Sequence, residues 1–562
     1  MTTTATRVLA RHELRAAFAR SLSAMYGREV PAYTTLVEVA GQVNADAFAR
    51  DPAAAQRLGS LDRVTAERHG AIRLGTRAEM RQVARVFAAL GMYPVGAYDL
   101  RDASASSVPV VSTAFRPTDP EELARNPFRV FTSLLTVWDE QFFDVDLRAR
   151  LGEFLARREV FGPELLALAD RADAEDGLGG DDARRFLALA TAAFELSPEP
   201  VDRAWYAELE AISPVAADIG GVGSTHINHL TPRVLDIDDL YERMTARGIT
   251  MIDEIQGPPR WDGPDVLLRQ TSFRALSEPR AFREPDGTVA AGSLRVRFGE
   301  VEARGIALTP AGRALYDDLL AEVDARLAAR AAARVDAARR DAARPEAAGA
   351  GGTAPKQGGG DDRSAVARAV WAERLPATED GLADADLAFF TYALTDRGRA
   401  AQGARAPQGA GTGPHTGEPD LATDRVGPID LAAAVAAGLV RRDPIVYEDF
   451  LPRSAAGIFR SNLAGGATGP VGSAGARGHS PGGAAGRPGS GETSTTADRS
   501  GELAWMAEML QRPVADPADL YAAQRAVSVA TVTAALGLGA RGVARFAPPA
   551  ATSAPSRSKE NA

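Results

Sequence analysis

The stretch RHGAIRLGTRAEMRQVARVFAALG, residues 68–91, decides the fold because two hydrophobic patterns meet in it. Its first part, RHGAIRLG, is typical of a short strand. Thr76 and Glu79 then have the spacing of a capping box. The apolar residues that follow share one face of a helix: Met80, Val83, Phe87 and Leu90. The stretch therefore predicts a strand followed directly by an amphipathic helix.

Three more strand-like runs follow: YPVGAYDL (93–100), VPVVSTAF (108–115) and FRVFTSLLT (128–136). After a helical stretch, the order β-α-β-β-β returns. Its segments are THINHL (225–230), the helix DIDDLYERMTARG (236–248), and the strands TMIDEIQ (250–256), VLLRQTSFRAL (266–276) and SLRVRFGEVEARG (293–305). The repeat predicts an α+β fold in which duplicated βαβββ modules form a curved mixed sheet around a shared site.

The composition is that of a soluble globular protein, and 562 residues suffice for two or three domains. The chain has 64 basic and 74 acidic residues, a formal charge of −10 that argues against general binding to nucleic acid or anionic membranes. It has no cysteine, which excludes disulfides, thiolate nucleophiles, iron–sulfur clusters and cysteine-bound zinc. No signal-like or membrane-spanning apolar run occurs. We therefore expect a cytoplasmic enzyme acting on a small molecule.

Composition shifts divide the chain into predicted regions. These are N-terminal helices with the first module (1–139), a helical insertion (140–212), the second module with a long helix (213–340), a low-complexity linker (341–366), a region closing the active site (367–463) with a flexible insert (399–425), a low-complexity insert (464–501), C-terminal helices (502–546) and a disordered tail (547–562). Of the six histidines, His415 and His479 fall in these inserts, which makes them poor ligand candidates.

Register selects between the remaining histidines. Thr76 and Asp236 are the expected N-cap residues of the two helices. His69 lies seven residues before Thr76, and His229 lies seven residues before Asp236. In a strand, His226 and His229 would point to opposite faces, so they would not bind one metal together. We therefore favour His69 and His229 as ligands, with His226 as the open alternative to His229.

A carboxylate is expected to complete the site. In LRVRFGEVE, Glu300 and Glu302 continue an apolar strand face, and unpaired buried charge is costly. A metal would supply the missing partner. The alternative is that Glu302 lies at a solvated strand end and Glu300 pairs with an arginine. Arg73 shares a strand face with His69 and could bind a substrate carboxylate, or it could form a structural salt bridge.

Two histidines and one carboxylate are the ligands of non-haem Fe(II) oxygenases, although Zn(II) or Mn(II) could occupy the same set. His69 could also be a structural core histidine.

Several segments resemble the 2-oxoadipate dioxygenase/decarboxylase family, a branch of the vicinal oxygen chelate superfamily. They are RHGAIRLGT, STAFRP, FRVFTSLL, HINHLTPR, LLRQTSF, RFGEVEARGIALTPAGRALYD and YEDFLPRSAAGIFRSNL. The likeness runs from about residue 10 to about 463 and resumes in the C-terminal helical part.

The resemblance implies duplicated βαβββ modules and Fe(II) bound by His69, His229 and Glu300. It implies conversion of 2-oxoadipate and O2 into 2-hydroxyglutarate, expected in the D form, and CO2 in lysine catabolism. The implied substrate contacts are His69, Arg73, Arg453 and Ser454, the last two in FLPRSAAG. Family members more often have Val at the position of Arg453, so substrate preference stays open there.

Two other functions stay open on the sequence. One is a Zn- or Mn-dependent lyase, isomerase or hydrolase acting on a small 2-oxo acid with the same scaffold. The other is a non-catalytic protein that binds a small acid. The oligomeric state and the role of the inserts are also open.

Overall fold

The computed structural model describes residues 7–57, 59–101, 107–295, 297–342, 359–405, 430–451 and 496–538. Its centre is a five-stranded mixed sheet in the order β3-β4-β5-β2-β8. The strands are β2 (Arg68–Leu74), β3 (Tyr93–Asp99), β4 (Val110–Arg116), β5 (Arg129–Leu135) and β8 (Ile227–Pro232). β2 is parallel to β5 and antiparallel to β8. The mixed α+β class and these five strands confirm the prediction.

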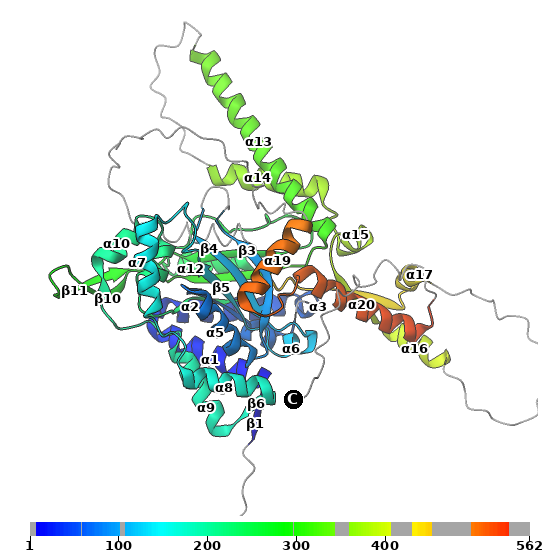
Figure 1. Cartoon of the computed structure of the whole chain (residues 1–562). Coiled ribbons are helices and arrows are strands. Elements are labelled where there is room, and N and C mark those ends of the chain that lie inside the picture. The colour runs from blue at the N-terminus through cyan, green and yellow to red at the C-terminus, as the bar shows by residue number, and fades with distance from the viewer. Residues whose placement is uncertain are drawn as a thin grey trace, which may run out of the picture.

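One face of this sheet is covered by helices, which gather on one side of it in Figure 1. Ile72 and Leu74 of β2 pack into their apolar core. The helices with most residues in this core are α1 (Arg11–Glu29), α2 (Pro31–Arg50), α5 (Arg77–Ala88) and α8 (Pro163–Glu175), and α12 (Ile237–Ala246) also packs into it. Because side chains alternate along a strand, His69, Ala71 and Arg73 are presented to the opposite face.

The predicted capping box fixes the junction between β2 and α5. The Glu79 amide donates to Thr76 Oγ1 at 3.1 Å, and the Thr76 amide donates to Glu79 Oε2 at 3.2 Å. Arg158 donates two hydrogen bonds to the same carboxylate, at 2.9 and 2.7 Å. Helix and strand are therefore rigidly connected next to Arg73.

We call the part from β2 to β5 the first unit and the part from β8 to residue 304 the second unit. The segment between the two units is mainly helical, with α7 (Val145–Ala156), α8 (Pro163–Glu175), α9 (Gly180–Ala192), α10 (Arg203–Glu210) and α11 (Pro214–Gly220). Two short strands interrupt it. β6 (Gly177–Gly179) pairs with β1 (Val8–Ala10), and β7 (Val201–Asp202) joins the edge of a hairpin from the second unit.

The second unit departs from the prediction in two places. TMIDEIQ is not a strand, because only isolated bridges join Met251 to Phe273 and Gln256 to Gln270. SLRVRFGEVEARG is not one strand but parts of two, β11 (Val289–Leu294) and β12 (Gly299–Arg304).

The break occurs because the two strands pair with different partners. β11 forms a hairpin with β10 (Glu278–Arg283), and β12 pairs with β9 (Leu268–Phe273). Between them, Arg297 turns inward to a buried ion pair with Glu278, at 2.9 Å from Nε to Oε2. Gly299 then lets β12 lie close to the Phe273 ring, since a Cβ there would come within 1.8 Å of a ring carbon.

Later parts of the chain pack against the end of β12. The Ala307 amide donates to the Ile445 carbonyl at 2.8 Å, and the Tyr447 amide donates to the Gly305 carbonyl at 2.9 Å. This region contains α13 (Pro310–Ala342), α14 (Gly359–Arg374), α15 (Glu379–Asp384), β13 (Phe390–Leu394), α16 (Asp396–Arg405), α17 (Leu431–Ala436), β14 (Val440–Pro444), α19 (Thr496–Leu510) and α20 (Pro517–Leu536). α13 extends away from the body in Figure 1.

The remaining described helices are α3 (Pro52–Arg57), α4 (Leu61–Ala66) and α6 (Pro120–Arg125). None of the helices in the described ranges combines the length and apolar composition needed to cross a bilayer. Much of the predicted linker, inserts and tail lies outside the described residues, namely 343–358, 406–425, 464–495 and 547–562. α14 includes residues 359–366 and α16 includes 399–405, which the sequence had assigned to linker and insert.

Candidate metal centre

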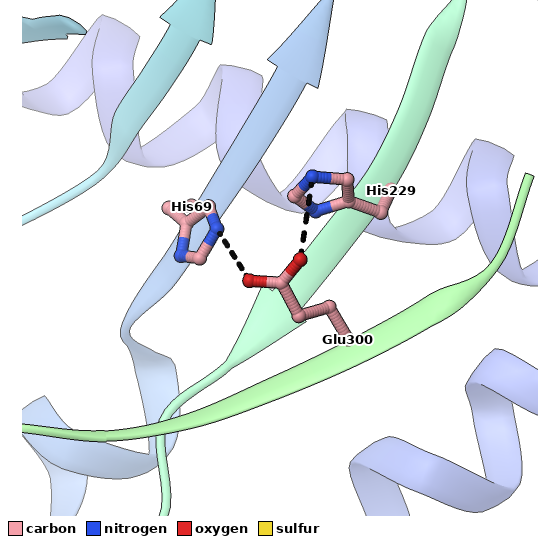
Figure 2. A group of neighbouring side chains, drawn as sticks. All are labelled: His69, His229 and Glu300. Atoms are coloured by element: carbon pink, nitrogen blue, oxygen red, sulfur yellow. Dashed lines mark ion pairs between the residues drawn. The ribbon is translucent and has the colours of Figure 1, made fainter. Parts of the chain in front are cut away.

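Three side chains from separate strands converge on the face of the sheet opposite the helices. His69 comes from β2, His229 from β8 and Glu300 from β12. His69 Nε2 lies 3.4 Å from Glu300 Oε1, and His229 Nε2 lies 3.6 Å from Glu300 Oε2. Figure 2 shows the carboxylate between the two rings. One donor atom from each residue lies within 4.8 Å of the others, and all three side chains are buried.

The structure places His226 in a different cluster. Its Nε2 lies 3.2 Å from Asp218 Oδ1 and 3.2 Å from Asn228 Nδ2. His229 instead contacts Thr231 Oγ1 through Nδ1, at 2.9 Å, which leaves its Nε2 toward Glu300. Of the two histidines, His229 is therefore the one beside His69.

The reason differs in part from simple strand alternation. β8 begins at Ile227, so His226 precedes the strand. The pairing of β2 with β8 also shifts register between Ala71 and Ile72. As a result Ile227 and Leu230, three residues apart, both pack over Gly70. Because of this register shift, side chains three residues apart in β8 can share a face. His226 and His229 are therefore separated by the residues that each contacts, Asp218 for His226 and Glu300 for His229.

Glu302 is not at a solvated strand end. It is 1% exposed, and both of its oxygens accept hydrogen bonds from Arg304, at 2.6 and 2.8 Å. Its Oε2 also lies 3.1 Å from His69 Nδ1. The arginine partner that the alternative interpretation gave to Glu300 belongs to Glu302. Glu300 has the two histidines as its ion-pair partners in the described part of the chain.

The charges of this cluster are set by burial and by neighbours. Burial, with His69 and Arg73 nearby, holds the pKa of His229 well below its usual range, which favours the neutral ring that a metal ligand requires. Burial also raises the pKa of Glu300, which His69 offsets only partly. Burial opposes charge on Glu302 as well, but Arg304 and His69 hold the pKa of Glu302 well below its usual range.

These features fit a divalent metal. Nε2 of His69 is buried and makes no hydrogen bond to any described residue, although it faces a carboxylate. Two imidazole nitrogens and one carboxylate oxygen suit Fe(II), Zn(II) or Mn(II), and three ligands leave positions open for a substrate. A cation between the three groups would offset the cost of burying the Glu300 carboxylate.

Aromatic rings enclose the histidines. Phe450 packs edge-on against His69 with ring centroids 5.0 Å apart, and Phe298 stacks on His229 at 5.1 Å. Phe131 packs in turn on Phe450 at 4.9 Å. These apolar rings lower the polarity around the histidines, which strengthens electrostatic interactions there.

Comparison with known proteins places this chain in a family. The family model of 2-oxoadipate dioxygenase/decarboxylase matches residues 18–462. A 2-oxoadipate dioxygenase/decarboxylase of Mycobacterium bovis is 54% identical over 80% of this chain and 87% of its own length. One from Pseudomonas putida is 39% identical over 80% of this chain and 86% of its own length.

The chain belongs to the 2-oxoadipate dioxygenase/decarboxylase family. The fold agrees with this assignment. The crystal structure of the hydroxyglutarate synthase from Pseudomonas putida, in complex with 2-oxoadipate, superimposes with a TM-score of 0.71 and 34% identity. The match covers 94% of this chain and 99% of that one.

The other residues that the family resemblance implied are placed as follows. Arg73 forms a buried ion pair with Asp218, a carboxylate that also accepts a hydrogen bond from Asn228 Nδ2 at 2.9 Å. This is the structural salt bridge considered as the alternative, and substrate binding by Arg73 stays a prediction. Arg453 and Ser454 lie outside the described residues.

Sequence reasoning missed three features around the cluster of His69, His229 and Glu300. It did not find Asp218 behind Arg73 or the clamp of Arg304 on Glu302. It also quoted Phe450 within a family segment without placing it against His69. The E-x-R spacing of Glu302 and Arg304 in GEVEAR puts both side chains on one strand face, and this signal predicts their ion pair. Asp218 had no signal, since a short helix far from β2 in sequence supplies it.

Proposed function

We propose that this protein is an Fe(II)-dependent dioxygenase/decarboxylase that converts 2-oxoadipate and O2 into D-2-hydroxyglutarate and CO2 in lysine catabolism. The observation that carries the proposal is the buried cluster of His69, His229 and Glu300, in a chain of this family. Zn(II) or Mn(II) would fit the same ligands, but the family's named reaction consumes O2, which favours a redox-active metal.

The atoms of this reaction balance without a further co-substrate. One carboxyl group of the six-carbon acid leaves as CO2. Both atoms of O2 enter the five-carbon product, one in the new carboxylate and one in the new hydroxyl group. When bound, Fe(II) supplies the redox chemistry by which O2 reacts with a 2-oxo acid.

The chain's own residues would position and enclose the substrate. His69, His229 and Glu300 would hold the metal, and Phe450 and Phe298 would exclude water from it. We assign the distal carboxylate of 2-oxoadipate to Arg73 and to Arg453 and Ser454 of FLPRSAAG, on the basis of the family resemblance alone. A guanidinium fixed by Asp218 would set the chain length that the site accepts.

We also infer that the two units are copies of one βαβββ module of the vicinal oxygen chelate type. Two observations support this. Each begins with a strand that carries a histidine of the cluster, and each helix is capped seven residues later, by Thr76 and by Asp236. The hairpin of β10 and β11 would then be an insertion in the second copy, and the strand expected after its helix would be reduced to the bridges at Met251 and Gln256. We also propose that the protein is cytoplasmic and that the chain is divided at the region boundaries predicted from its sequence.

The proposal is tested by assaying purified protein with 2-oxoadipate after loading it separately with Fe(II), Zn(II) and Mn(II), in air and under nitrogen. We expect 2-hydroxyglutarate and CO2 only with Fe(II) and only in air, with chiral chromatography assigning the D form. Turnover under nitrogen or with zinc alone would instead identify a lyase, isomerase or hydrolase. Binding of 2-oxoadipate with no turnover under any condition would identify a binding protein.

A further inference from the structure

We propose that Glu302 orients His69 for metal binding, by accepting a hydrogen bond from Nδ1–H so that Nε2 faces the metal. Glu302 would thus be a positioning residue that makes no contact with metal or substrate. The inference rests on the metal centre proposed above and assigns a role to a residue outside the cluster.

His69 lies between two carboxylates that share one face of β12. Its Nε2 lies 3.4 Å from Glu300, and its Nδ1 lies 3.1 Å from Glu302. The two carboxylates differ in their surroundings, since Glu300 faces the two histidines and Glu302 faces an arginine. Of the two, Glu302 is therefore already paired with an arginine, whereas Glu300 has no arginine or lysine partner among the described residues.

Glu302 is fixed both through its side chain and through its backbone. Arg304 donates to Oε1 from Nε at 2.6 Å and to Oε2 from Nη2 at 2.8 Å. The third donor of Arg304, Nη1, donates to the carbonyls of Tyr447 and Asp449, at 2.7 and 3.1 Å. The Val234 amide donates to the Glu302 carbonyl at 2.8 Å. These contacts hold the Glu302 carboxylate in a fixed position beside the His69 ring.

A neutral imidazole has one proton, and the hydrogen bond made by one nitrogen decides which nitrogen can bind a metal. A carboxylate beside Nδ1 favours the proton there and leaves the lone pair on Nε2. In the structure Nδ1 is within reach of Glu302 but makes no aligned hydrogen bond to a described residue, so the proposal includes a rotation of the ring.

The second histidine supports this arrangement independently. His229 also has Nδ1 occupied by a neighbour, the Thr231 hydroxyl at 2.9 Å, and it directs Nε2 toward Glu300. Both rings would therefore present Nε2 to the metal, each with Nδ1 held by a residue of the sheet. Phe450 packs against the His69 ring and limits other orientations.

The test is the affinity of metal-free protein for Co(II), measured by calorimetry under nitrogen for wild type, Glu302→Gln and Glu278→Gln. Glu278 is a matched control, because it is a buried carboxylate that accepts hydrogen bonds from an arginine, Arg297 Nε, at 3.0 and 2.9 Å, and has no ion pair with the three cluster residues in the described part of the chain. We expect Glu302→Gln to weaken Co(II) binding about 10- to 100-fold. Glu278→Gln should bind Co(II) as wild type does.

Equal weakening in both variants would reduce Glu302 to a general structural role, and unchanged binding in Glu302→Gln would contradict the proposal directly. Wild-type protein that binds no Co(II) would overturn the metal centre itself, which is a different result.

A second measurement does not depend on a variant that folds. In wild-type protein loaded with Zn(II), nitrogen NMR of the histidines should show the His69 ring protonated at Nδ1 and not at Nε2. A proton on Nε2 would contradict the assignment. The His69 signals can be identified in the wild-type protein by nuclear Overhauser contacts to the Phe450 ring, whose centroid lies 5.0 Å from that of the His69 ring.

Discussion

His226 and His229 are three residues apart, but their side chains belong to different clusters. The Asp218 carboxylate and the Asn228 amide contact His226, and His229 faces Glu300. At the scale of single residues, the site is thus defined by the partner of each polar atom. Sequence spacing alone does not define it.

Substitution of the two histidines should therefore give different results. His229→Ala removes a proposed ligand, so we expect metal affinity to fall by more than the roughly 10- to 100-fold loss typical of residues that only support a ligand. His226→Ala should retain one bound metal per chain. Metal analysis after dialysis measures both. Loss of metal from His226→Ala with retention in His229→Ala would reverse the ligand assignment.

The pair of Arg73 and Asp218 allows a test of substrate recognition that preserves buried charge balance. Removing Arg73 alone would leave Asp218 unpaired, at a cost of about 3–5 kcal/mol. In the double variant Arg73→Gln, Asp218→Asn, both charges are removed. We expect KM for 2-oxoadipate to rise about 10- to 100-fold, since a hydrogen bond to a charged group is worth about 1.5–3 kcal/mol.

The matched substrate control is 2-oxohexanoate, which lacks the distal carboxylate. Its KM should change little between wild type and the double variant. If both substrates lose affinity equally, Arg73 has a structural role only.

At the scale of elements, a buried charged network joins the strands that carry the site. Glu67, just before β2, accepts from Arg233 after β8 at 2.9 Å and pairs with Arg129 of β5. Arg129 lies 2.7 Å from Glu448, in the segment that leads to Phe450. The network therefore fixes the relative positions of β2, β5, β8 and the segment covering His69.

This network predicts loss of stability in acid. Burial opposes ionisation of Glu67, but Arg233 and Arg129 lower its pKa to about 2. A carboxyl whose pKa is lower in the folded than in the unfolded state stabilises the fold above the unfolded pKa of about 4.3, and this contribution disappears as the pH falls toward the folded pKa. We expect the free energy of unfolding to fall between about pH 4.3 and 2, and less steeply in Glu67→Gln. Urea titrations over this range check it, and equal slopes would contradict it.

The elements also show what the sequence could predict. The capping box at Thr76 and the strands up to residue 135 were predicted because their signals are local. The break between β11 and β12 was not, because Arg297 turns away to Glu278 and Gly299 approaches Phe273, which are both tertiary contacts. Register selected His69 and His229, and the family resemblance alone selected Glu300 over Glu302; the structure brings the three together, and metal binding by them stays a prediction. Asp218 has no local signal in the sequence.

At the scale of the whole molecule, the centre ties together strands from distant parts of the chain. His69 and Glu300 are more than two hundred residues apart in sequence, and Phe450, from a still later segment, packs on His69. A bound metal should therefore stabilise the whole fold.

Metal removal tests this directly. A ligand that binds only the folded state raises the free energy of unfolding. The increase is about 2.7 kcal/mol when the free ligand concentration is a hundred times Kd. We expect the Tm of wild type to fall on chelation and to recover when Fe(II) is restored under nitrogen. In His229→Ala, chelation should not change Tm. An identical decrease in that variant would show that the chelator acts elsewhere.

The central claim is that this chain uses O2 to decarboxylate and hydroxylate one 2-oxo acid. The most direct measurement is turnover of 2-oxoadipate by the Fe(II)-loaded protein under isotopically heavy dioxygen, with mass spectrometry of the product. We predict 2-hydroxyglutarate carrying both heavy oxygen atoms, one in the new carboxylate and one in the hydroxyl group. Product that carries neither atom, formed at the same rate under nitrogen, would contradict the account.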